Sequence, residues 1–112
     1  MTFIENLNNL KIKIFADGAD LDTMIKLNSV EYISGFTTNP TLMRKSGVKD
    51  YKEFAKSITD KIQEKPISLE VFADDIHDMY CQAKKISSWG DNINVKIPIT
   101  NTKKLNTIDL IA

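Results

Sequence analysis

The chain has 112 residues, with 15 basic and 15 acidic side chains and a formal net charge of zero. This length suits one modest domain, and the interspersed charges do not favour nucleic acid or an anionic membrane as a partner. The single cysteine, Cys81, excludes an internal disulfide and a cysteine metal cluster, which fits a cytoplasmic protein. No run approaches the ~18 apolar residues of a membrane span, and residues 1–11 lack the pattern of a signal peptide.

Strand-like runs alternate with helical patterns along the chain. This βαβα order predicts a parallel sheet covered by helices. The strands are expected at residues 12–16, 33–37, 67–72 and 92–97. The helices are expected at residues 21–27, 40–43, 50–63 and 74–89, with a last helix beginning near residue 102.

Within the helices, Asp20 and Asp74 are placed to act as N-caps. The helical spacing of apolar residues predicts that Tyr51 and Tyr80 belong to buried stripes. Cys81 is interpreted as a small buried hydrophobe. We expect His77 on a solvated helix face, because its acidic neighbours in the sequence do not face one point as metal ligands would.

Alternation along the strands separates side chains that pack on helices from those that do not. Glu70 and Lys96 fall on the face opposite the packing residues of the third and fourth strands, and Asp17 does so in the first. All three lie near the carboxyl ends of their strands, where parallel α/β proteins bind ligands. Thr37 and Asn39 add a polar turn at the same end.

Lys96 ends an apolar strand that is stopped by Pro98. In a partly dry strand-end pocket, desolvation disfavours the ammonium form and frees the lone pair for attack on a carbonyl. Asp17 and Glu70 would then move the protons that imine chemistry requires. The alternative is that the two carboxylates only pair with Lys96 at a solvated strand end, and sequence spacing does not separate the two interpretations.

Four segments, in this order and spacing, resemble the first half of a transaldolase from about residue 11 onward. They are Lys13–Asp17 (KIFAD), Gly35–Leu42 (GFTTNPTL), Ser68–Val71 (SLEV) and Asn94–Thr100 (NVKIPIT). The resemblance implies a (β/α)8 barrel with a Schiff-base lysine on its fourth strand, matching Lys96. It also implies proton transfer by Asp17, substrate hydrogen bonding by Asn39 beside Thr37, and a role for Glu70 through a bound water.

The reaction implied by the resemblance is transfer of a dihydroxyacetone unit between sugar phosphates. It belongs to carbohydrate metabolism and the pentose phosphate pathway and needs no metal or organic cofactor. Fructose 6-phosphate aldolases of the same family carry Gln at the position of Glu70, so this residue favours transfer over simple aldol cleavage. Because no glycine-rich phosphate loop follows the first strand, an unrelated flavodoxin-like domain is disfavoured.

The resemblance also implies that residues 1–112 form a single partial domain that ends after the fourth strand, because an eight-stranded barrel takes ~200 residues or more. We therefore expect half a barrel, which leaves strand edges and an inner face uncovered. Such a chain would act in a homo-oligomer or with a complementing C-terminal half. A non-catalytic half-barrel that serves only for assembly is the alternative from a different functional class.

Overall fold

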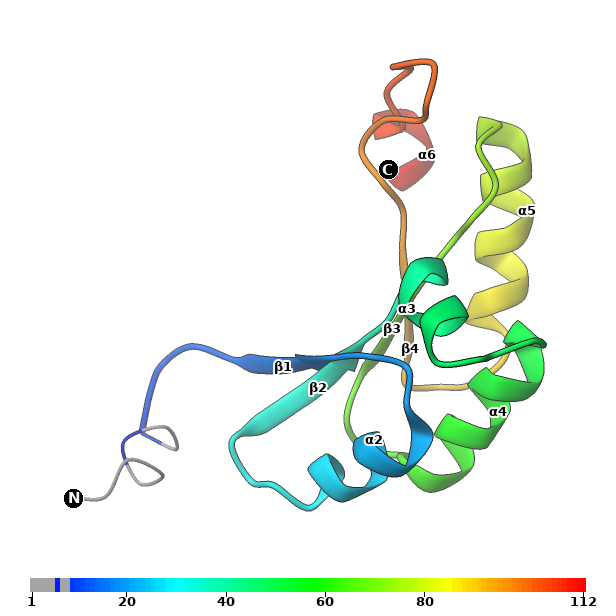
Figure 1. Cartoon of the computed structure of the whole chain (residues 1–112). Helices are drawn as coiled ribbons and strands as arrows, with labels where there is room; N and C mark the ends of the chain where they lie inside the picture. The colour runs from blue at the N-terminus through cyan, green and yellow to red at the C-terminus, as the bar shows by residue number, and fades with distance from the viewer. Residues whose placement is uncertain (1–5, 7–8) are drawn as a thin grey trace.

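The protein is represented by a computed structural model that describes residue 6 and residues 9–112 (Figure 1). Much of the N-terminal segment for which the sequence predicts no signal peptide lies outside the described residues. The elements are β1 (Ile14–Asp17), α2 (Leu21–Asn28), β2 (Ile33–Thr37), α3 (Pro40–Lys45), α4 (Tyr51–Lys61), β3 (Ile67–Glu70), α5 (Ile76–Ser87), β4 (Ile93–Lys96) and α6 (Ile108–Ile111).

The strands form one parallel sheet in the order β1-β2-β3-β4, so each strand pairs with the next in the sequence. This confirms the predicted α/β class. Neighbouring parallel strands joined through helices are consistent with the first half of a (β/α)8 barrel. The register pairs Asp17 with Thr37 and Glu70 with Lys96, which aligns the polar strand ends expected from the sequence.

One face of the sheet carries the helices and the hydrophobic core (Figure 1). The alternation in β3 explains this, because Ile67 and Leu69 are fully buried while Ser68 and Glu70 keep partial exposure. The most deeply buried large apolar side chains come from the strands, from the helices and from the end of α4: Phe36, Ile58, Ile62, Ile67, Leu69 and Met79. Their burial against one face leaves the other face for polar groups.

The opposite face of the sheet carries no helix in the described part of the chain (Figure 1). Phe15 lies on this face and is 40% exposed. Its ring packs over Gly35, where a Cβ atom would lie 2.6 Å from the ring and 2.7 Å from the carbonyl oxygen of Pro66. The absence of a side chain at position 35 therefore allows Phe15 to lie along the sheet.

The C-terminal segment differs from the prediction. The last helix is present, but its predicted start near residue 102 is wrong, because residues 98–107 form an irregular segment and α6 begins only at Ile108. The side chain of Asn101 accepts hydrogen bonds from the main-chain nitrogens of Lys103 and Leu105, and Lys104 adopts a φ of 63°. These local bonds stabilise a turn in place of a helix.

Of the two predicted N-caps, Asp74 is wrong and Asp20 is confirmed in position. The N-cap of α5 is Asp75, which accepts from the main-chain nitrogen of Asp78, and not Asp74. Asp74 instead bonds to Thr102, as described below. Asp20 occupies the N-cap position of α2, but its side chain accepts from the Thr23 hydroxyl and makes no cap bond to the main chain.

The outer surface of α5 holds two residues that the sequence predicts to be buried. Cys81 and Tyr80 are both exposed, and the Lys84 amine lies 4.8 Å from the centre of the Tyr80 ring. The helix buries Met79 and Ile86 instead, which places residues 80 and 81 away from the sheet. The exposure of His77 agrees with its predicted place on a solvated helix face.

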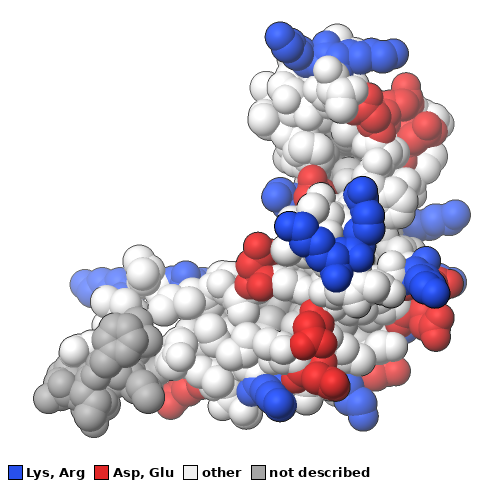
Figure 2. Space-filling model, in the orientation of Figure 1, with Lys and Arg blue, Asp and Glu red and all other residues white. Residues whose placement is uncertain are grey.

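Basic and acidic side chains occur together along the face of the molecule shown in Figure 2. This distribution agrees with the balanced composition of the chain. Across residues 6 and 9–112, no helix combines the length and the apolar character that a membrane crossing requires.

Candidate functional site

The central feature of the site is an ion pair between Glu70 and Lys96. These residues end β3 and β4, are paired in the sheet register, and point to the face that carries no helix. The Lys96 Nζ atom lies 3.7 Å from Glu70 Oε2. Their side chains are 60% and 20% exposed, respectively. Alternation and strand pairing thus bring together the predicted amine and one predicted carboxylate.

The exposure of Lys96 differs from the partly dry pocket that the sequence analysis expects. The reason lies in the topology, because β4 is an edge strand of the described sheet and nothing in the described part of the chain covers its inner face. The amine therefore has one acidic neighbour and otherwise faces solvent. An exposed pair of this kind contributes little to stability.

The second carboxylate, Asp17, forms a separate pair with Thr37. The Thr37 hydroxyl donates to Asp17 Oδ1 over 2.9 Å, and the two residues are partners in the β1–β2 register. Asp17 borders a cavity of about 220 Å³ between the end of β1 and α2, α3 and β2. Residues lining the larger cavity at the ends of β2, β3 and β4 include Asn39 and Glu70 but not Asp17.

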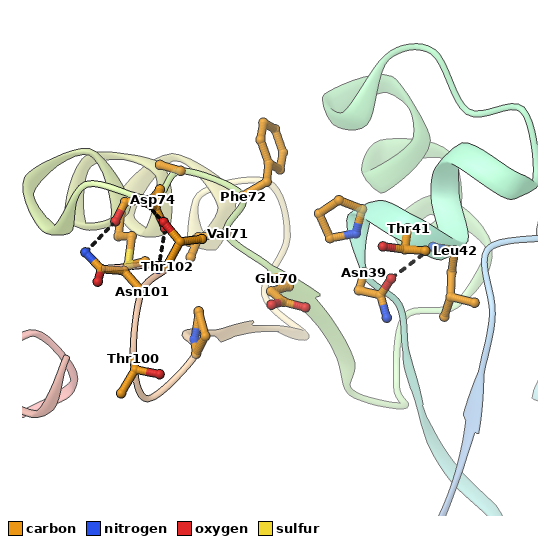
Figure 3. A pocket seen from close by; sticks show the side chains of 14 residues that line it. Asn39, Thr41, Leu42, Glu70, Val71, Phe72, Asp74, Thr100, Asn101 and Thr102 are labelled. Carbon is orange, nitrogen blue, oxygen red and sulfur yellow. Dashed lines mark hydrogen bonds between the residues drawn. The ribbon is translucent and has the colours of Figure 1, made fainter. Parts of the chain in front are cut away.

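Asn39 has a defined structural task at this end of the sheet. Its side-chain oxygen accepts from the main-chain nitrogen of Leu42 over 2.9 Å, which makes it the N-cap of α3. Pro40 follows at the first helical position, a combination typical of helix starts. The cap bond fixes the amide plane, so the side-chain nitrogen is directed away from the helix (Figure 3).

The larger cavity has a volume of about 680 Å³ and lies beside Glu70 (Figure 3). Asn39 borders it on one side, and Asp74, Asn101 and Thr102 border it on the other. The lining combines carboxylate, amide and hydroxyl groups with apolar side chains such as Val71 and Met79, a mixture that suits a hydroxylated ligand. Lys96 is not among the lining residues, although its partner Glu70 is. The predicted residues fall into three groups: the Glu70–Lys96 pair, the Asp17–Thr37 pair and the Asn39 cap.

The sequence analysis missed the contact that orders one wall of this cavity. Asp74 Oδ1 accepts from the main-chain nitrogen of Thr102 over 2.8 Å, and its other oxygen accepts from the Thr102 hydroxyl. The Asn101 side chain adds a bond to the Asp74 carbonyl. The hydroxyl bond first, and the main-chain bond second, lower the pKa of Asp74 below its ordinary 3.8. No spacing signal links residues 74 and 102, because they lie on different loops.

Tyr51 was also missed, since its helical spacing indicates only packing. Its hydroxyl donates to the main-chain carbonyl of Glu70 over 2.8 Å, and its ring packs against Phe72 and Trp89. Burial, reinforced by the nearby charge of Glu70, raises the pKa of Tyr51 above its usual range. The hydroxyl consequently remains a hydrogen-bond donor at neutral and mildly alkaline pH.

Metal-ligating side chains do not gather in the described part of the chain. Among residues 6 and 9–112, no group of three His, Cys, Asp or Glu side chains is placed to hold a metal ion. Cys81 Sγ and His77 Nε2 lie 3.8 Å apart on the exposed side of α5.

The fold and the site together define a class of protein. It is an α/β protein with successive parallel βα units, consistent with the first half of a (β/α)8 barrel, that carries an amine, carboxylates and an amide at the carboxyl ends of its strands. In this class, residues at that end of the strands form the functional site.

Comparison with known proteins gives the family. The model of the family described as transaldolase/fructose-6-phosphate aldolase matches residues 14–108. A "Probable transaldolase" of Dehalococcoides mccartyi is 39% identical over 89 residues, which cover 80% of this chain and 41% of that protein. Proteins of the same printed name from Ruegeria sp. and Thermoanaerobacter sp. are 40% and 42% identical, each over 80% of this chain and 40% of the relative.

The chain belongs to the transaldolase/fructose-6-phosphate aldolase family. This confirms the resemblance drawn from the four sequence segments. The chain spans about two fifths of the length of the curated relatives that it matches.

Proposed function

We propose that this chain provides the Schiff-base part of a transaldolase that transfers a dihydroxyacetone unit between sugar phosphates. Lys96 is the nucleophile that condenses with the ketone of the donor sugar. Glu70 moves protons through a water during imine formation and hydrolysis, and Asp17 handles protons during carbon–carbon cleavage. The reaction, so written, needs no metal or organic cofactor.

The observation that carries the proposal is the 3.7 Å approach of the Lys96 amine to the Glu70 carboxylate at the ends of adjacent strands. Membership of the family gives this pair a chemical context. A carboxylate beside the amine can take and return the proton that carbinolamine dehydration requires. The adjoining 680 Å³ cavity offers room and polar groups for a sugar.

Two further contacts support the assignment of the remaining residues. The bond from Thr37 orients the Asp17 carboxylate and leaves its second oxygen available for a proton. The cap bond of Asn39 uses its side-chain oxygen, so its nitrogen remains available to donate to a substrate hydroxyl. We propose these as the roles of Asp17, Thr37 and Asn39.

The proposal includes a covering structure for Lys96. The Lys96 side chain is 60% exposed to solvent, so imine chemistry requires that the surroundings of this amine become drier. We propose that residues 1–112 are one part of a barrel domain, and that further βα units, in a complementing C-terminal half, or a second copy of the chain cover the inner face. We place the assembled protein in the cytoplasm, in keeping with the free Cys81.

Borohydride trapping tests this proposal directly. The chain is mixed with the part of the Dehalococcoides mccartyi relative that it does not cover, given fructose 6-phosphate and reduced with borohydride. Mass mapping should place a stable sugar adduct on Lys96. The variant Lys96→Arg should lose the adduct, and Lys103→Arg, which changes an exposed lysine elsewhere, should keep it. Absence of label on Lys96 in this mixture rejects the imine mechanism.

Product analysis separates the proposed transfer from its alternatives. The family description also covers fructose-6-phosphate aldolase, for which free dihydroxyacetone would appear without an acceptor. The glutamate at position 70 favours transfer, in which the product forms only when an aldose phosphate is added. A chain that binds the complementing half but gives neither product nor adduct would be an assembly module.

A further inference from the structure

The main-chain carbonyl of Glu70 has no main-chain donor from the β2 side of the sheet. Main-chain nitrogens of β2 and its extension donate to β3 at every second residue, from Phe36 to Pro66 over 2.9 Å and from Thr38 to Ser68 over 3.1 Å. The next step of this ladder would run from residue 40 to the carbonyl of Glu70. Residue 40 is proline, which has no N–H group, so the ladder stops there.

Tyr51 supplies the missing donor. It is the first residue of α4, and its hydroxyl donates to the Glu70 carbonyl over 2.8 Å. The ring is held in place by Phe72, stacked at 5.1 Å between ring centres, and by Trp89, edge-on at 5.5 Å. The aromatic contacts fix the direction of the hydroxyl, and its half-buried position makes the bond worth more than a solvated one.

The peptide group after Glu70 is thereby held from both sides. Its carbonyl accepts from Tyr51, and its N–H group, which belongs to Val71, donates to the main-chain carbonyl of Lys96 over 3.1 Å. A rigid peptide at this point limits rotation of β3 about its own axis. The Glu70 side chain leaves the main chain one bond before this peptide, so the same two contacts set the direction of its Cα–Cβ bond and limit where its carboxylate can reach.

We propose that Tyr51 is a positioning residue that holds the Glu70 carboxylate against the Lys96 amine. Tyr51 does not line the larger cavity, and its hydroxyl bonds to the main-chain carbonyl of Glu70. It therefore acts through the main chain of β3. The inference rests on the proposed function only in giving the Glu70–Lys96 pair a catalytic task. The geometric claim, that Tyr51 maintains the pair, stands on the contacts themselves.

A mutant cycle on the 112-residue chain tests this claim without any sugar. Each lysine is acetylated with a limiting amount of N-hydroxysuccinimidyl acetate, and the rate at Lys96 is measured by mass spectrometry relative to the rate at Lys103. In the chain that keeps Tyr51, Glu70→Gln should raise the acetylation rate of Lys96 roughly two- to fivefold, because glutamine does not form an ion pair with the lysine. In the Tyr51→Phe background, which keeps the ring and loses the hydroxyl, the same change should have almost no effect.

A matched variant removes a hydroxyl elsewhere. Tyr80→Phe, on the exposed side of α5, should leave the full effect of Glu70→Gln in place. Hydrogen exchange adds a local measurement, since the Val71 amide should exchange several-fold faster in Tyr51→Phe while the Ile67 amide is unchanged. Equal effects of Glu70→Gln in the two backgrounds overturn the proposal. So does a Glu70→Gln change without effect in the wild type, or a Tyr51→Phe chain that circular dichroism shows to be unfolded.

The labelling readout also separates this inference from the proposed function. Acetylation of Lys96 requires no ketose, no imine and no complementing half. If borohydride trapping fails but Glu70→Gln changes Lys96 acetylation only when Tyr51 is present, the transaldolase mechanism is rejected and the positioning role of Tyr51 is kept. If trapping succeeds but Glu70→Gln has the same effect on Lys96 acetylation with and without the Tyr51 hydroxyl, the positioning role is rejected and the transaldolase mechanism is kept.

Discussion

At the residue scale, Asn39 combines a structural and a proposed chemical task in one amide. Its oxygen caps α3, which leaves the amide nitrogen available for a substrate in the cavity that Asn39 borders together with Glu70. Only a side chain with an acceptor and a donor in one plane can serve both tasks. The two tasks are separable by substitution, because aspartate caps helices as well as asparagine does but cannot donate when ionised.

We therefore expect Asn39→Asp and Asn39→Ala to behave differently. Asn39→Ala should lower the free energy of unfolding by about 1 kcal/mol, because the main-chain nitrogen of Leu42 loses its partner. Asn39→Asp should keep the stability in urea denaturation but weaken borohydride trapping with fructose 6-phosphate by roughly tenfold, as one substrate hydrogen bond is lost. Gln63→Glu, which makes the same amide-to-carboxylate change at an exposed residue beyond α4, serves as the control for both measurements. Unchanged trapping in Asn39→Asp would remove Asn39 from the substrate site.

At the scale of elements, the loop after β3 and the loop after β4 act as one unit. Asp74 and Asn101 join them through bonds to Thr102 and to the Asp74 carbonyl. Gln82 of α5 fixes the first of these loops by accepting from the main-chain nitrogens of Phe72 and Ala73. The wall of the cavity is thus ordered by side chains outside the strands, as in many sites built on loops over a rigid sheet.

The contact between Asp74 and Thr102 predicts a specific dependence on pH. Because hydrogen bonds from Thr102 lower the pKa of Asp74 in the folded state, its contribution is present above the ordinary value of 3.8 and is lost as the pH falls through the lower folded value. The amide signal of Thr102 in an NMR titration should therefore shift with a midpoint below 3.8. The shift should vanish in Asp74→Asn and persist in Asp91→Asn, an exposed aspartate on another loop. A midpoint at or above 3.8 would contradict the bond.

The strands and their inner faces could be predicted because alternation is a local property of the sequence. The parity of residues 67–70 and 93–96 is enough to place Glu70 and Lys96 on one face, and the structure brings them into contact. The segment from residue 98 to 107 could not be predicted in the same way. There the Asn101 side chain accepts from the main-chain nitrogens of Lys103 and Leu105, and Thr102 donates to Asp74. These side-chain bonds take the place of the main-chain bonds of a helix.

The candidate site likewise could be predicted only in part from the sequence. The identities of the amine, the carboxylates and the amide follow from residue types at strand ends. Their grouping does not, because it depends on the register between neighbouring strands: Asp17 contacts Thr37 across β1 and β2, and Glu70 contacts Lys96 across β3 and β4. The proposed role of Tyr51 depends on Pro40, which interrupts the main-chain hydrogen bonds between β2 and β3. The helical spacing of apolar residues around Tyr51 does not reveal this dependence.

At the scale of the whole molecule, the dominant feature is a sheet whose helices, among residues 9–112, lie on one face only (Figure 1). β1 and β4 are both edge strands of the described sheet, and Phe15 exposes 40% of its surface on the uncovered face. Unpaired edges and exposed apolar side chains favour pairing with another chain. With a net charge of zero, two copies of the chain meet no long-range repulsion.

We therefore expect the 112-residue chain alone to associate reversibly in sedimentation experiments, with a fraction of larger species that rises with concentration. Phe15→Lys should weaken this association about tenfold, because it places a charge in the buried contact and removes apolar area. Ile25→Lys changes an exposed apolar residue of α2, on the helical side, and should leave association unchanged. Circular dichroism checks that both variants fold. A folded wild-type chain that stays monomeric at all concentrations would mean that the inner face tolerates water, and the covering structure proposed for Lys96 would lose its physical basis.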